Sequence, residues 1–151
     1  MEISKIIIAS DHAGFELKEH LKFTLKDKQI NVVDIGTDST ESCNYPIFAK
    51  KLCNEVLSNN CFGILICGTG IGMSMTANRF NKIRATLCTS KQMAQLSRQH
   101  NNANVLCIGA RITGKKDAEE IVNTFLNTDF DTSNKRHKNR IAMFDYITAQ
   151  K

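Results

Sequence analysis

Short apolar stretches alternate with stretches of helical periodicity along almost the whole chain, which is the pattern of a parallel sheet covered by helices. Residues 3–9 are predicted as the first strand, because Ile6, Ile7 and Ile8 form the continuous apolar stretch expected when both faces are buried. The pattern therefore predicts an α/β fold with a five-stranded parallel sheet. The other predicted strands are residues 30–35, 62–67, 83–88 and 105–109.

Helices are predicted between these strands. In residues 13–27, leucines recur at i, i+4 and i+8 and form one apolar stripe, whereas the neighbouring lysines, Lys18 among them, and His20 are expected to face water. Pro46 suits the first position of a helix that runs to Ser58, because its missing N–H would be unpaired there. The remaining helices are predicted at residues 71–80, 91–100 and 115–127, and at 132–150 as a terminal helix that packs on a neighbour.

Composition fits one globular domain over residues 1–151, with 42% hydrophobic residues and a net charge of +5. No stretch approaches about 18 apolar residues, so we expect no membrane contact and no secretion signal. The six cysteines lack C-x-x-C and paired zinc spacing, which predicts reduced thiols in a cytoplasmic protein. Five of them are expected to be small buried hydrophobes: Cys43, Cys53, Cys61, Cys88 and Cys107.

The positive charge is concentrated in residues 131–140, which favours one anionic ligand over a nucleic-acid surface. Arg136 and Arg140 are four residues apart, so a helix places both guanidinium groups on one face, where they can grip a phosphate. A solvated or RNA-contacting run of charge is the alternative for this segment taken alone.

Ligands of open parallel sheets bind outside the carboxyl ends of the strands. Asp11 and His12 follow the first strand, where they could hold a sugar hydroxyl and a phosphate, although a helix N-cap with an exposed histidine explains them equally well. Gly109-Ala110-Arg111 follows the last strand. His100 and Asn101 end a polar helix, and by themselves they indicate a cationic helix end followed by a capping residue.

A glycine-rich segment, residues 67–72, follows the third strand and is the most informative of these ends. Alternating glycines let backbone N–H groups approach an anion, or simply make a tight turn. No lysine follows as in a P-loop, and Met73 stands where the dinucleotide-binding pattern needs glycine. Cys67 opens the segment, where aligned N–H groups stabilise a thiolate, so it can act as a base; a buried hydrophobe is the alternative.

Five strings give the chain a family resemblance that covers nearly its whole length in order. It resembles the type B ribose-5-phosphate isomerases, including their galactose-6-phosphate isomerase relatives. The strings are SDHAGFELK (10–18), GILICGTGIGMSMTANR (63–79), IRA (83–85), AQLSRQHNNANVLCIGAR (94–111) and RHKNR (136–140).

The resemblance implies a Rossmann-like three-layer α/β/α sandwich with a C-terminal helix. It also implies a homodimer, which could pair into a tetramer, with active sites shared between subunits. The implied activity is the interconversion of D-ribose 5-phosphate and D-ribulose 5-phosphate through a cis-enediolate, in the non-oxidative pentose phosphate pathway, without a metal or other cofactor.

The resemblance also implies roles for individual residues. Cys67 looks like the base that moves a proton between C1 and C2, assisted by Thr69, and His100 looks like the residue that opens the furanose ring. Asp11 and Asn101 would hold hydroxyls. The N–H groups that would stabilise the enediolate belong to Gly68, Thr69, Gly70, Ile71 and Gly72, and the phosphate would be held by His12, Arg111, Arg136 and Arg140.

Two positions separate this chain from other branches of the family. One branch has a glutamate base where this chain has Met73, so the resemblance is to the cysteine type. Asn44 stands where many relatives have aspartate, which affects one contact from that loop but not the base. The alternatives are an isomerase of galactose or allose 6-phosphate and a non-catalytic module that binds phosphate or nucleotide.

Overall fold

The computed structural model describes residues 5–149, and every predicted strand and helix is present there. The elements are β1 (Ile6–Ser10), α1 (Phe15–Asp27), β2 (Val32–Asp34), α2 (Tyr45–Asn59), β3 (Phe62–Cys67), α3 (Ile71–Ala77), β4 (Ala85–Leu87), α4 (Lys91–Asn101), β5 (Val105–Gly109), α5 (Lys115–Leu126) and α6 (Lys135–Ala149).

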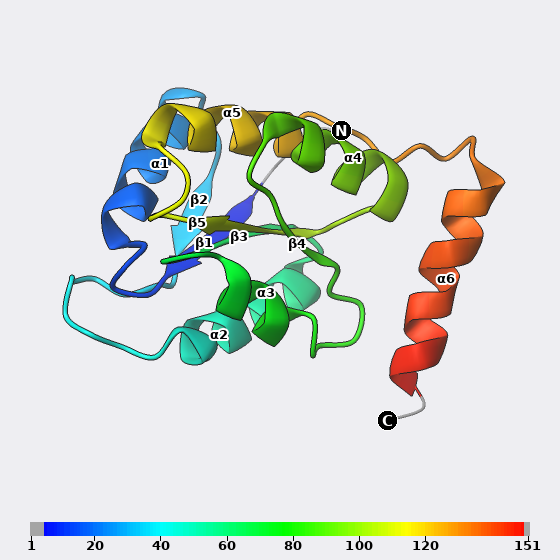
Figure 1. Cartoon of the computed structure of the whole chain (residues 1–151), viewed down its shortest axis with the longest axis horizontal. Coiled ribbons are helices and arrows are strands. Elements are labelled where there is room, and N and C mark those ends of the chain that lie inside the picture. Colours follow the sequence, from blue (N-terminus) through cyan, green and yellow to red (C-terminus); the bar gives the residue numbers. More distant parts are fainter. Residues whose placement is uncertain (1–4, 150–151) are drawn as a thin grey trace.

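All five strands are parallel and lie in the order β2-β1-β3-β5-β4. Helices α1, α4 and α5 cover one face of the sheet, and α2 and α3 cover the other (Figure 1). Each face has its own apolar core, and the three central strands are almost completely buried between the two cores. The predicted three-layer α/β/α sandwich with a C-terminal helix is confirmed.

Several element boundaries differ from the prediction. The edge strands β2 and β4 have only three residues each, fewer than the predicted 30–35 and 83–88. Helix α2 begins at Tyr45, which makes Pro46 its second residue and not its first. Helix α3 ends at Ala77, three residues earlier than predicted. The predicted strand residues 3 and 4 and the predicted helix residue 150 lie outside the described part of the chain.

The prediction that Lys18 and His20 face water was wrong. Lys18 is only 1% exposed, and its Nζ pairs with Asp34 at the end of β2 and with Glu19. His20 is half-buried, with its Nε2 2.5 Å from Oε1 of Glu119 on α5. The leucine stripe of α1 was identified correctly. Beside it, Lys18 is buried and His20 is half-buried because carboxylates on neighbouring elements pair with them. The periodicity of one helix contains no information about such partners.

Helix α6 stands to one side of the sandwich, drawn in orange to red in Figure 1, and touches it mainly through α4. Its apolar side chains remain largely uncovered in a single chain. None of the helices within residues 5–149 is long and apolar enough to cross a membrane. The exposed apolar residues of α6 are Met143, Phe144, Tyr146 and Ile147, each at least 41% exposed.

Candidate active site

The loops that follow three adjacent strands meet at the carboxyl edge of the sheet. The N–H of Asp11, directly after β1, donates to the carbonyl of Ile66 at 3.2 Å. Cys67 at the end of β3 pairs with Gly109 at the end of β5, and the N–H of Ala110 donates to the carbonyl of Cys67 at 2.8 Å. The topology therefore brings Asp11, Cys67 and the start of the last loop together, as the sequence predicted.

The glycine-rich loop holds the Cys67 sulfur in a fixed place. Cys67 is 5% exposed, and its Sγ accepts the N–H of Gly70 at 3.1 Å. Gly70 has φ +77°, and a Cβ there would lie 2.5 Å from Cδ1 of Leu87, so only glycine fits. The exposed Thr69 accepts the N–H of Ile71 through its hydroxyl at 3.3 Å. Two of the N–H groups assigned to an enediolate thus hold Cys67 and Thr69 in this structure.

Two side chains from other loops flank the glycine-rich loop. A Cβ on Gly68 would lie 2.9 Å from Nη1 of Arg111, so the guanidinium packs directly against this glycine. A Cβ on Gly72 would lie 2.5 Å from Cζ of Tyr45. The sequence placed Arg111 near the site but gave Tyr45 no role. The polar loop of residues 35–44 follows a strand and leads directly to Tyr45, which could have suggested one.

Asp11 and His12 shape the loop between β1 and α1. The Oδ1 of Asp11 accepts the N–H of Gly14 at 3.1 Å, and the N-cap of α1 is Gly14, so Asp11 closes the loop and does not cap the helix. His12 is half-buried, and its Nδ1 accepts the backbone N–H of Cys43 at 3.2 Å. The loop before α2 therefore reaches the predicted phosphate-binding histidine.

The remaining cysteines divide into two groups. Burial raises the pKa of Cys53 to about 12 and raises the pKa of Cys88 and of Cys107 as well, so these thiols are inert core residues, as predicted. Cys61 is only half-buried, so the prediction of a buried thiol holds only in part there, although burial raises its pKa. The prediction was wrong for Cys43, which is half-exposed and lies beside the His12 ring because the polar loop carries it over the sheet edge.

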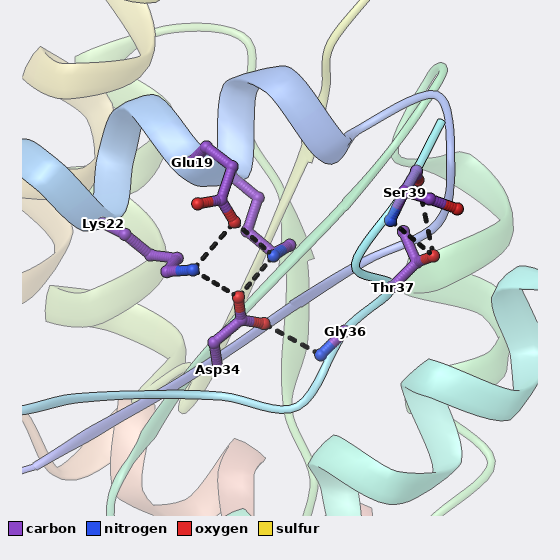
Figure 2. Close-up of polar contacts among 7 residues, drawn as sticks. Glu19, Lys22, Asp34, Gly36, Thr37 and Ser39 are labelled. Carbon is purple, nitrogen blue, oxygen red and sulfur yellow. Dashed lines mark hydrogen bonds and ion pairs between the residues drawn. The ribbon is translucent and has the colours of Figure 1, made fainter. Parts of the chain in front are cut away.

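Figure 2 shows how Asp34 anchors the start of this polar loop. One carboxylate oxygen of Asp34 pairs with Lys18 and with Lys22, the latter at 2.7 Å, and the other accepts the N–H of Gly36 at 2.9 Å. The next residue, Thr37, donates its N–H to the carbonyl of Ser10 at 3.0 Å. The loop is thereby joined to the end of β1, directly before Asp11.

The Asp34→Asn variant is expected to destabilise the protein by about 3 kcal/mol, because it leaves the buried Lys18 with only the exposed Glu19 as a counter-charge. Hydrogen bonds from the two lysines and from Gly36 lower the pKa of Asp34 against the opposing effect of burial. This stability is therefore present above about pH 4, the unfolded-state pKa, and is lost as the pH falls through the lower folded-state pKa. Urea denaturation measures the loss, with Lys22→Met, at the more exposed end of the network, as a control expected to cost less than about 1 kcal/mol.

His100 and Asn101 lie at the other edge of the sheet. Helix α4 connects β4 to β5 and therefore runs against the strands, so its last residues sit near their amino ends. The adjacent Asn104, directly before β5, accepts the N–H of Gly63 at the start of β3 at 3.0 Å. The six residues of β3 span about 17 Å, which separates His100 from Cys67 within one chain.

Helix α6 joins His100 at this second edge. The imidazole rings of His100 and of the buried His137 stack at 4.4 Å between centroids. Burial, and the neighbouring His100 and Arg136, lower the pKa of His137, which favours a neutral ring in the stack. Arg136 and Arg140 are exposed on the same helix as His137. The predicted site residues thus form two groups, one at each edge of the sheet.

Arg98, one turn before the end of α4, supports the second group and was missed by sequence reasoning. Its guanidinium lies over the rings of Phe62 and Phe125, and its Nη1 donates to the carbonyl of Ala103 at 2.5 Å. Burial lowers the pKa of Arg98 to about 10. A single arginine in a polar helix gives no sequence signal for such burial.

Comparisons with known proteins identify similar chains over almost the full length. The family model described as Ribose/Galactose Isomerase matches residues 6–144. The chain is 41% identical over 140 residues to ribose-5-phosphate isomerase B of Escherichia coli, covering 92% of this chain and 93% of that protein. It is 40% identical over 143 residues to a Rickettsia conorii protein named as a sugar phosphate isomerase without a stated sugar, covering 94% and 98%.

Solved structures agree with these matches. The structure of a ribose 5-phosphate isomerase from Thermotoga maritima superposes with a TM-score of 0.92 at 53% identity, covering 96% of this chain and 99% of that one. The ribose-5-phosphate isomerase B structure from Clostridium thermocellum gives a TM-score of 0.93 at 42% identity, covering 97% and 98%.

Proposed function

We propose that this chain, which belongs to the ribose/galactose isomerase family of sugar phosphate isomerases, interconverts D-ribose 5-phosphate and D-ribulose 5-phosphate. The observation that carries the proposal is the Cys67 sulfur, held by the glycine-rich loop between Asp11 and Arg111 at the carboxyl edge of the sheet. A base, a carboxylate and a cation there are the groups that an aldose-ketose isomerase of a phosphorylated sugar requires.

In the proposed mechanism, Cys67 takes a proton from C2 of the open-chain aldose to form a cis-enediolate and returns it to C1. The proton of the C2 hydroxyl moves to O1, so that C2 becomes the carbonyl and O1 the hydroxyl of the ketose. Backbone N–H groups of the glycine-rich loop stabilise the enediolate oxygens, which is the electrostatic contribution that usually matters most. Thr69 stands exposed beside Cys67 and assists it. Asp11 holds a substrate hydroxyl, and His12 and Arg111 hold the phosphate.

A second copy of the chain completes the site in this proposal. Four residues with proposed roles lie at the opposite edge of the sheet from Cys67. They are His100 for ring opening, Asn101 for a hydroxyl contact, and Arg136 and Arg140 for the phosphate. A dimer in which the second edge of one subunit faces the first edge of the other brings the two groups together. The uncovered apolar residues of α6 support such a contact. The free state of all six cysteines supports a cytoplasmic location for this dimer.

A substrate panel tests the proposed specificity. Ribose 5-phosphate is expected to give a kcat/KM at least about tenfold above galactose 6-phosphate and allose 6-phosphate, because a site fitted to five carbons excludes an added CH₂OH group. Coupled spectrophotometric assays of ketose formation measure each rate. A higher kcat/KM for a six-carbon sugar phosphate would show that ribose 5-phosphate is not the preferred substrate. It would leave the proposed isomerase chemistry unchanged.

A further inference from the structure

The contact between Cys43 and His12 determines which nitrogen of the imidazole carries the proton. The backbone N–H of Cys43 donates to Nδ1 of His12 at 3.2 Å. A backbone amide is always a donor, so Nδ1 must be an acceptor and cannot carry a hydrogen. The Cys43 Sγ lies 3.9 Å from the same nitrogen, and once the backbone N–H has made Nδ1 an acceptor, the thiol can only be the donor in this second contact. The ring is therefore neutral in this contact, with its hydrogen on Nε2.

The polar loop is anchored at both ends, which holds the N–H of Cys43 against Nδ1 of His12. Its first residues are joined to Asp34 and to the carbonyl of Ser10, as described above. Its last residue before α2, Asn44, accepts the N–H of Ile47 through its carbonyl at 3.2 Å, and the following Tyr45 packs on Gly72. Cys43 lies between these anchors, directly before Asn44, and they hold its segment of the loop beside His12.

We propose that the backbone N–H of Cys43 is a positioning group that fixes His12 as the neutral Nε2–H tautomer. His12 then offers its substrate one uncharged N–H donor at the carboxyl edge of the sheet, while Arg111 supplies the positive charge there. The identity of the bound anion rests on the proposed function, whereas the tautomer rests only on the contact with Cys43. The role belongs to the backbone of residue 43, which makes its side chain replaceable.

Nitrogen NMR of the protein labelled with ¹⁵N-histidine tests the tautomer directly. The expected result for His12 is a pyridine-type Nδ1 and a pyrrole-type Nε2, assigned by the signals that the His12→Gln variant loses. A pyrrole-type Nδ1, or two imidazolium-type nitrogens at neutral pH, would overturn the proposal. This measurement needs no substrate, so it gives a result even if the protein fails to isomerise ribose 5-phosphate.

Two substitutions at one position test the positioning role. Cys43→Pro removes the N–H, and it is expected to mix the two His12 tautomers and to raise KM about tenfold with kcat within about twofold, as for the loss of one hydrogen bond. Cys43→Ala removes the sulfur but keeps the N–H, and it is expected to leave the His12 signals and KM unchanged. If Cys43→Ala alters both as Cys43→Pro does, the side chain holds the ring and the proposal is wrong. If Cys43→Pro fails to fold, a pyrrole-type Nδ1 in the wild-type spectrum, or altered His12 signals in Cys43→Ala, would still overturn the proposal.

Inorganic phosphate separates this proposal from the proposed function. Its binding, followed through the His12 Nε2 signal, is expected to weaken in Cys43→Pro and to remain unchanged in Cys43→Ala. A fixed Nε2–H tautomer with no turnover of any sugar phosphate would reject the function and leave the tautomer proposal standing. Turnover of ribose 5-phosphate by a protein whose His12 carries its hydrogen on Nδ1 would support the function and reject the tautomer proposal.

Discussion

The Cys67→Ala variant is expected to lower kcat for ribose 5-phosphate isomerisation by about 10² to 10⁴-fold, the range for loss of a general base, with a much smaller change in KM. The reason is the position of the sulfur, which the N–H of Gly70 holds at the strand end where Asp11 and Arg111 also lie. The alanine methyl group that replaces the thiol cannot accept a proton.

Two further variants make this result specific to Cys67. Cys88→Ala removes a thiol whose pKa burial has raised and which lies in the core, so its rate is expected to stay within about twofold of wild type. Cys67→Ser keeps a hydrogen-bonding side chain of similar size, but a serine hydroxyl is a far weaker acid than a thiol. A large loss of kcat is therefore expected for this variant too. An unchanged rate in Cys67→Ala would remove Cys67 as the base and leave the fold assignment intact.

The sequence predicted the fold well because the signals are local. A continuous apolar stretch such as Ile6, Ile7 and Ile8 is typical of a strand buried on both faces, and helical periodicity between such stretches leaves few alternatives to a parallel sheet. The carboxyl-edge group of site residues followed from the same argument. Strand ends of a parallel sheet are neighbours whatever the detailed packing, so Asp11, Cys67 and Arg111 could be brought together before any coordinates were known.

Apart from the element boundaries, the errors concern contacts between distant parts of the chain. Lys18 is buried because Asp34, on another element, compensates its charge, and a helical pattern contains no information about that partner. Cys43 was predicted to be buried because most free cysteines are, yet the loop that carries it packs on His12. The role of Tyr45 depends on the space above Gly72, which only the folded loop defines.

The separation of His100 from Cys67 has a topological cause. A helix between two parallel strands must run against them, so residues at its end lie near the amino edge of the sheet, whereas β3 delivers Cys67 to the carboxyl edge. The resemblance implied that subunits share their sites, and the fold of one chain supplies a physical reason for sharing. If one site uses both residues, they must come from different copies of the chain.

Subunit complementation is expected to restore activity from two variants that are each nearly inactive. Cys67→Ala and His100→Asn each remove one member of the proposed site, and the homodimer of either variant is expected to retain less than about one-hundredth of the wild-type rate. A mixed dimer pairs the intact Cys67 of one subunit with the intact His100 of the other. Since half of randomly formed dimers are mixed and each has one intact site, the mixture is expected to show about a quarter of the wild-type specific activity.

Co-expression of these two variants with different affinity tags, followed by an assay of the unseparated mixture with ribose 5-phosphate, tests the shared isomerase site most directly. As a control, Cys67→Ala mixed with Asp11→Asn is expected to show no recovery, because both residues lie at the same edge of the sheet. The first mixture is expected to show about a quarter of the wild-type rate. A rate no higher than that of the more active variant alone, from a preparation shown to contain mixed dimers, would contradict it.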